Sequence, residues 1–166
     1  MSVRVRDARD EDGDGVIALI ALCWSDYPGC VLDVEGEQPE LRAIASHFRA
    51  VRGHFWVAER DGAIVGCVGA APAEVSDGFE LCKLYVAHGD RRHGLGGAFV
   101  RRVEDAAVTA GSQFVGLWSD TRFTDAHRLY ERLGYVRLSG IRKLDDVSNT
   151  VEYQYRKALY LDVNVT

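Results

Sequence analysis

A glycine-rich segment at the junction of two apolar segments constrains this chain more than any other feature. The first apolar segment covers residues 79–86, and the chain then runs Gly89-Asp90-Arg91-Arg92-His93-Gly94-Leu95-Gly96-Gly97. From Leu95 to Ala110 the apolar residues recur at helical spacing, with charged residues on the opposite face, until Gly111. The sequence therefore predicts a strand, a tight turn and a helix in direct succession.

This turn is suited to bind an anion. Glycines permit a tight turn and leave the backbone N–H groups accessible, while a helix N-terminus offers unpaired donors and the positive end of its dipole. The stretch from Arg91 to Arg102 holds four arginines and no acid, which favours a multiply charged phosphate ligand over a single carboxylate. Neither the Walker pattern nor G-x-G-x-x-G is present. The alternative is a purely structural turn with solvated arginines.

The other segments predict a mixed α/β chain. Its 166 residues suit one domain, residues 1–166, without a linker or repeat. Further strands are expected at 3–6, 54–59, 63–71, 114–118, 135–144 and 151–159, and further helices at 16–23, 39–52 and 126–133.

Charge and hydropathy exclude several functions. A formal net charge of −5 disfavours a nucleic-acid partner, because binding to phosphates needs a basic face. The longest apolar run, Val16 to Trp24, is far shorter than the ~20 residues of a membrane span, and the N-terminus lacks a signal-like apolar core, so we expect a cytoplasmic protein without a membrane partner. The cysteines show no C-x-x-C spacing and indicate reduced thiols rather than zinc ligands; they are Cys23, Cys30, Cys67 and Cys82.

Two motifs carry a resemblance to a known family. Arg91-x-x-Gly94-x-Gly96, directly after Leu84-Tyr85-Val86, resembles the [Arg/Gln]-x-x-Gly-x-[Gly/Ala] acetyl-CoA signature of the GNAT-type N-acetyltransferase superfamily. Residues 126–135, Ala-His-Arg-Leu-Tyr-Glu-Arg-Leu-Gly-Tyr, are similar to a second family motif. The order of predicted elements matches from Val3 to Leu159. The resemblance implies a GNAT fold, with a central mixed, mostly antiparallel twisted sheet of about seven strands flanked by about four helices.

The resemblance also implies an activity and a cosubstrate. A GNAT enzyme transfers an acetyl group from acetyl-CoA to a primary amine, here of a small molecule or peptide, without a metal. The positions that match the family's cofactor site are Leu84, Tyr85, Val86, Arg91, Arg92, His93, Gly94, Leu95, Gly96 and Gly97. One position departs from the pattern: Phe123 stands where many relatives carry an asparagine that bonds the pantetheine arm.

Direct attack of an amine on a thioester needs a general base and a general acid. Tyr130 matches the family tyrosine that serves as the acid, although its place on the apolar stripe of a helix is also typical of packing. Glu80 is the predicted base, because several GNAT relatives place a glutamate on the corresponding strand and reach the amine through water; the alternative is a solvated carboxylate at the strand end. Asp120, just beyond the strand at 114–118, competes with it. His127 is expected on a helix face away from Tyr130, as a surface residue.

The acceptor side is predicted from charge. The stretch from Asp26 to Glu40 holds five acids and no base, which would attract a cationic acceptor, and Trp24, Asp26 and Tyr27 are the predicted substrate-binding residues. The alternative is a solvated loop whose acids face water.

Two other functions remain as alternatives. One is a catalytically inactive acyl-CoA sensor or partner-binding module on the same fold. The other is a nucleotide-phosphate enzyme, which the missing Walker lysine disfavours. A homodimer through the last strands is a further expectation, with Tyr153, Tyr155 and Tyr160 either in that contact or covering the chain's own sheet.

Overall fold

Seven strands form one sheet in the computed structural model, which describes residues 2–74 and 76–160. The strand order is β1-β2-β3-β4-β5-β7-β6, and β4 and β5 run parallel while every other neighbouring pair is antiparallel. The strands are β1 (Arg4–Asp7), β2 (His54–Arg60), β3 (Ala63–Pro72), β4 (Gly78–Val86), β5 (Phe114–Asp120), β6 (Val136–Lys143) and β7 (Val151–Ala158). The expected mixed, mostly antiparallel sheet is confirmed.

Five α-helices accompany the sheet, one more than expected. They are α1 (Gly13–Trp24), α2 (Val34–Glu37), α3 (Ile44–Ala50), α4 (Leu95–Thr109) and α5 (Thr124–Arg132), with short 3₁₀ turns η1 (Asp10–Asp12), η2 (Pro39–Ala43) and η3 (His88–Asp90). The extra turn α2 begins where the Asp33 carboxylate accepts the Gly36 N–H at 2.9 Å. The helix predicted from Pro39 to Arg52 is divided into η2 and α3, because Ala43 leaves the helical region at φ −143°.

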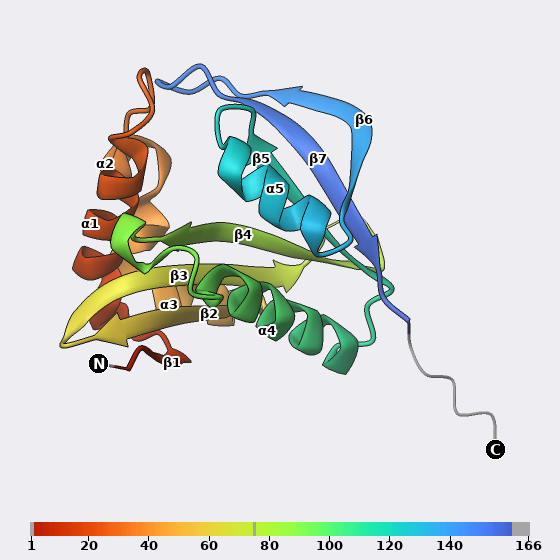
Figure 1. Cartoon of the computed structure of the whole chain (residues 1–166), viewed down its shortest axis with the longest axis horizontal. Coiled ribbons are helices and arrows are strands. Elements are labelled where there is room, and N and C mark those ends of the chain that lie inside the picture. The colour runs from red at the N-terminus through yellow and green to blue at the C-terminus, as the bar shows by residue number, and fades with distance from the viewer. Residues whose placement is uncertain (1, 75, 161–166) are drawn as a thin grey trace.

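The helices cover the two faces of the sheet (Figure 1). α4 and α5 pack on one face, where Phe99 and Val103 of α4 join a buried cluster with Phe79 and Leu117. α1 and α3 pack on the other face, in a separate cluster that includes Val57. β2 contributes to both clusters in alternation, as expected for a strand covered on both sides.

The sheet opens between its two parallel strands. β4 and β5 pair only at Gly78 with Phe114, Phe79 with Val115 and Glu80 with Gly116, and beyond these pairs the strands diverge (Figure 1). A bulge in β4 accompanies the divergence, because the register with β3 shifts and Lys83 takes φ +51°. The resulting gap leaves backbone groups of β4 facing no neighbouring strand.

Tyr153, Tyr155 and Tyr160, expected either in a contact between copies or over the chain's own sheet, differ in burial. Tyr155 is 1% exposed and belongs to the core, so it covers the chain's own sheet and is not available for a contact between copies. Tyr153 is partly buried beneath Arg137, whose guanidinium lies 4.2 Å from the ring centroid, whereas Tyr160 is exposed.

All four cysteines are free thiols, with Cys23 and Cys67 buried. Among the described residues, no helix has the length and apolarity to cross a membrane.

Candidate active site

The turn between β4 and α4 exposes a row of backbone donors. Arg92 and Gly94 both take positive φ values, +65° and +81°. Across the part of the chain that the structure describes, none of the amides from Arg92 to Gly97 donates to a protein acceptor, and the helical bonding begins with the Ala98 N–H to the Gly94 carbonyl at 3.0 Å. The predicted anion-binding turn is therefore open to a ligand rather than capped by the protein.

A buried ion pair holds the start of this turn. Asp90 is 5% exposed, and its carboxylate accepts two hydrogen bonds from the Arg60 guanidinium at 2.5 and 3.1 Å. The pair fastens η3 to the end of β2. Sequence reasoning missed it, because the two residues lie 30 positions apart in different predicted elements.

A cavity of about 480 Å³ extends from this turn along the end of β4. Eight of the predicted cofactor residues line it: Leu84, Tyr85, Val86, Arg91, Arg92, Gly94, Gly96 and Gly97. The other two do not line it: His93 is exposed, and Leu95 packs against the core near Gly66. Arg128 and Arg132 of α5 join Arg91 and Arg92, against the single acid Asp125, so this donor cavity is cationic.

Aromatic side chains form one wall of the donor cavity. Phe123 packs against Tyr27, with ring centroids 4.8 Å apart, and against Tyr85 at 6.4 Å. The Tyr85 hydroxyl accepts a hydrogen bond from the Trp24 indole at 3.0 Å. Tyr27 thus lies on the donor side and does not line the acceptor cavity predicted for it, whereas Trp24 lines both cavities.

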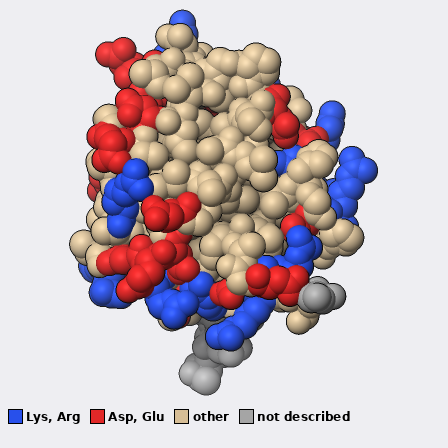
Figure 2. All heavy atoms as spheres, turned by 90° about the vertical axis from the view of Figure 1, so that its left-hand side faces the viewer, with Lys and Arg blue, Asp and Glu red and all other residues tan. Residues whose placement is uncertain are grey.

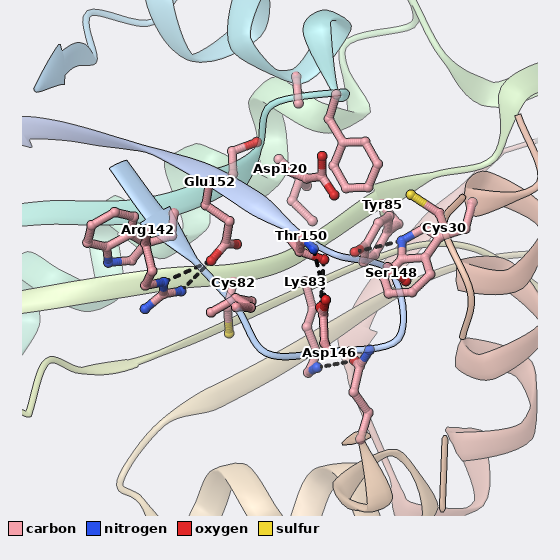
Figure 3. Close-up of a pocket in the computed structure, with 18 of the residues that line it drawn as sticks. Cys30, Cys82, Lys83, Tyr85, Asp120, Arg142, Asp146, Ser148, Thr150 and Glu152 are labelled. Carbon is pink, nitrogen blue, oxygen red and sulfur yellow. Dashed lines mark hydrogen bonds and ion pairs between the residues drawn. The ribbon is translucent and has the colours of Figure 1, made fainter. Parts of the chain in front are cut away.

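A second cavity, of about 520 Å³, lies on the other side of the gap. It shares Trp24, Leu84, Tyr85, Phe123 and Ala126 with the donor cavity, so the two meet where β4 and β5 diverge. Figure 3 shows Tyr85 and Ser148 near one end of this acceptor cavity and the facing pair Arg142 and Glu152 near the other. The arrangement gives two adjoining cavities that share a wall at the gap between β4 and β5.

Two predicted catalytic residues line the acceptor cavity with free functional groups. Tyr130 of α5 is 4% exposed and packs against Tyr135 and Tyr155, with ring centroids 5.9 and 5.8 Å away. Burial raises the pKa of the Tyr130 phenol, which keeps its proton at neutral pH. Glu80 is half-buried at the last pair of β4 with β5, and burial raises the pKa of its carboxyl as well. Among described residues Glu80 makes no hydrogen bond or ion pair.

Asp120 lines the same cavity but is already engaged. Its two oxygens accept hydrogen bonds from the Arg122 guanidinium at 3.0 and 2.8 Å, and one also accepts the Arg122 N–H at 2.9 Å. The Asp120 carboxylate is therefore committed to Arg122, unlike the unpaired carboxylate of Glu80.

The expectation for His127 was wrong. It is 8% exposed, lies between the Tyr153 and Tyr155 rings at 5.5 and 5.6 Å, and shares a hydrogen bond with Ser119 at 3.1 Å. His127 and Tyr130 are three residues apart and share one face of α5, and both rings pack against Tyr155 of β7.

Two loops enclose the acceptor cavity, which the sequence did not indicate. The Val31 N–H donates to the Ser148 hydroxyl at 2.8 Å, and the Val147 N–H donates to Glu37 at 2.7 Å. We call this contact between residues 31–37 and 147–148 the loop clasp.

Glu37 and Gln38 of the acidic stretch line the cavity, but Asp26 is exposed and lines neither cavity. Figure 2 shows carboxylates along one side and the lower part of the face that carries α1 and α2, around an uncharged centre.

A mixed sheet that splays between two parallel strands, with an anion-binding turn at one end of the gap, is the architecture of a class of acyltransferases. The chain belongs to the acetyltransferase (GNAT) family, whose family model matches residues 16–135.

Individual relatives agree with this assignment. The chain is 31% identical over 135 residues to the "Probable N-acetyltransferase camello" of Xenopus tropicalis, across 74% of this chain and 58% of that protein. The chain thus spans less than two thirds of the length of that relative. A GNAT acetyltransferase from Staphylococcus aureus Mu50 superimposes with a TM-score of 0.81 at 20% identity, covering 96% of this chain and all of that one. The PaiA N-acetyltransferase of Thermoplasma acidophilum, solved with coenzyme A, superimposes with a TM-score of 0.70 at 15% identity, with 96% and 100% covered. These likenesses confirm the predicted fold.

Proposed function

We propose that this chain transfers the acetyl group of acetyl-CoA to the primary amine of a small molecule or peptide by direct attack. The observation that carries the proposal is the meeting of two cavities in the gap between β4 and β5. Unpaired amides and arginines occupy one side, and an unpaired carboxylate and a buried phenol occupy the other.

The donor cavity fits coenzyme A by its chemistry. The amides from Arg92 to Gly97 and the four arginines suit a pyrophosphate and a further phosphate. Beyond Glu80, β4 has no pairing with β5, so its backbone around Leu84 suits the amide groups of a pantetheine arm, which would add to β4 like a short strand. Phe123 supplies an apolar surface instead of a side-chain hydrogen bond.

Acetyl-CoA supplies a thioester carbonyl that an uncharged amine can attack. In our proposal Glu80 accepts a proton from the incoming ammonium through a water molecule, which leaves the nitrogen lone pair free. The new C–N bond forms as the C–S bond breaks, and Tyr130 donates its phenolic proton to the departing sulfur. The proton that the nitrogen loses as the amide forms restores the phenol through solvent, and Glu80 releases its own proton to solvent before the next turnover.

Replacement of Tyr130 by phenylalanine tests the proposal. The change keeps the packing against Tyr135 and Tyr155 but removes the proton donor, so we expect kcat to fall tenfold or more, as loss of a general acid does. The measurement is release of the coenzyme A thiol with a panel of amines. Binding of coenzyme A, measured by calorimetry, is the control and should stay unchanged.

The same assays address the alternative of an inactive sensor. A sensor would bind coenzyme A and release no thiol with any amine. Unchanged kcat in Tyr130→Phe would remove Tyr130 as the acid, and failure of the wild type to bind coenzyme A would overturn the whole proposal.

A further inference from the structure

The charge of the acceptor cavity restricts which amines can occupy it. Six carboxylates line it, against two cationic side chains: Glu37, Glu80, Asp120, Asp145, Asp146 and Glu152 face Lys83 and Arg142. We infer that the acceptor is a small aliphatic amine with a second cationic group, a diamine or polyamine. This inference rests on the proposed acetyl transfer and specifies its substrate class.

Neither cation in the cavity is free to bind an anionic acceptor. Arg142 donates to Glu152 at 2.9 and 2.6 Å and covers the Trp118 ring at 4.4 Å (Figure 3). Lys83 donates to Gln38 at 2.7 Å and pairs with Glu40 at 3.1 Å. A carboxylate on the acceptor would therefore find no unpaired cation and several negative neighbours.

Several carboxylates, by contrast, lack a cationic partner among the residues described. Glu80 makes no ion pair, and Glu37 and Asp146 accept hydrogen bonds only from neutral donors, the Val147 N–H at 2.7 Å and the Thr150 N–H and hydroxyl at 2.8 and 2.6 Å. Their charges remain uncompensated inside a partly enclosed space, where electrostatic attraction is stronger than in bulk water. A second ammonium group on the acceptor would supply the missing charge.

The size of the cavity favours a small acceptor. Its volume of about 520 Å³ is in the range of small-molecule sites. The loop clasp and residues 144–150 bound it opposite β4. The shared end at Tyr85 receives the amine to be acetylated, and the Glu152 end lies across the cavity (Figure 3).

A series of three four-carbon amines tests the inference. Putrescine, butylamine and γ-aminobutyrate each offer a primary amine, but their far ends are cationic, neutral and anionic. We expect kcat/KM to fall in that order, by about tenfold from putrescine to butylamine, as one close charge interaction would give. Added salt should reduce the difference in kcat/KM between the amines, because salt screens the charge interaction.

Glu152→Gln provides the matched variant. It removes one negative charge and releases the Arg142 guanidinium into the cavity, so the preference for putrescine over γ-aminobutyrate should fall at least tenfold. The control is Glu104→Gln. Glu104 pairs with Lys157 at 3.0 Å, its side chain is as little exposed as that of Glu152, and it lies outside both cavities. The control should keep the wild-type order of the three amines.

The outcomes separate the inference from the proposed function. Equal kcat/KM for the three amines, a preference for γ-aminobutyrate, or turnover confined to other amines overturns the inference and leaves acetyl transfer standing. No thiol release with any amine overturns acetyl transfer, and the inference with it. An equal loss of preference in Glu104→Gln would show that the cavity charge is not responsible, which also overturns the inference.

Discussion

Glu80 shows how the surroundings of one residue set its working pH. Burial raises the pKa of its carboxyl, and the neighbouring Glu152 carboxylate acts in the same direction, while Arg142 opposes both. A general base works only when deprotonated, so activity should be lost as the pH falls through this raised pKa. We therefore expect the acidic limb of kcat/KM to lie above the pH at which an ordinary glutamate titrates, about 4.3.

The measurement is a pH profile with an aliphatic amine that stays protonated across the acidic range, so that only the enzyme titrates there. Glu80→Gln should lower kcat at least tenfold and abolish the acidic limb. Asp120→Asn is the comparison, because Asp120 is engaged by Arg122, and the limb should persist in it. Loss of the limb in Asp120→Asn alone would reverse the assignment.

Single residues differ in how far the sequence predicts them. Tyr130 was predicted from a motif, and its burial beside a cavity fits that prediction. His127, three positions earlier, was placed on the surface, although residues three apart share a helix face and it is buried beside Tyr130. Its partners, Ser119 and two tyrosines of β7, come from elements that the sequence cannot align with α5.

At the scale of elements, the turn before α4 depends on backbone conformation. Gly94 takes φ +81°, and a Cβ there would meet no atom within 4 Å. Gly94→Ala therefore introduces strain without a clash, about 1–2 kcal/mol. We expect the turn to relax, the donor amides to lose their alignment, and KM for acetyl-CoA to rise several-fold.

Gly111, after the other end of α4, offers a matched control. It takes φ +75° with equally open space around its Cβ position, and it lines neither cavity. Gly111→Ala should lower the free energy of unfolding by a similar amount and leave KM for acetyl-CoA unchanged. Equal KM values in both variants would show that the turn geometry does not govern donor binding.

The same elements show what sequence patterns can and cannot specify. The strand, turn and helix around residues 79–110 were predictable, because glycine positions and apolar spacing are local signals. The divergence of β4 from β5 was not, because it depends on where pairing between strands stops. The loop clasp was equally hidden, since it joins segments more than a hundred residues apart.

At the scale of the whole molecule, the two adjoining cavities carry opposite charge. The arginines of the donor cavity lie on α5 and the turn before α4, and most of the acids of the acceptor cavity come from α2, β7 and the loop before it. Although the net charge of the chain is −5, the donor cavity is cationic and the adjoining acceptor cavity is anionic. Such a division suits the binding of an anionic donor and a cationic acceptor from opposite sides.

Global stability should depend on pH through His127. Burial lowers the pKa of its imidazole, whereas the unfolded chain titrates near the ordinary value of about 6.5. Above that pH the imidazole is neutral in both states, so its stabilising contacts are fully present. As the pH falls below about 6.5 the unfolded chain takes up the proton first, and the free energy of unfolding declines until the pH passes the lowered pKa of the folded state.

His127→Gln isolates this effect, because glutamine can still bond Ser119 but does not titrate. Urea unfolding at a series of pH values should give a steeper loss of stability for the wild type than for the variant between about pH 6.5 and 5, by at most about 1.4 kcal/mol per pH unit, the limit for one proton. The slopes are compared rather than the absolute stabilities, because the substitution also changes packing between Tyr153 and Tyr155. If the free energy of unfolding changed equally with pH in the wild type and the variant, protonation of His127 would not be coupled to folding.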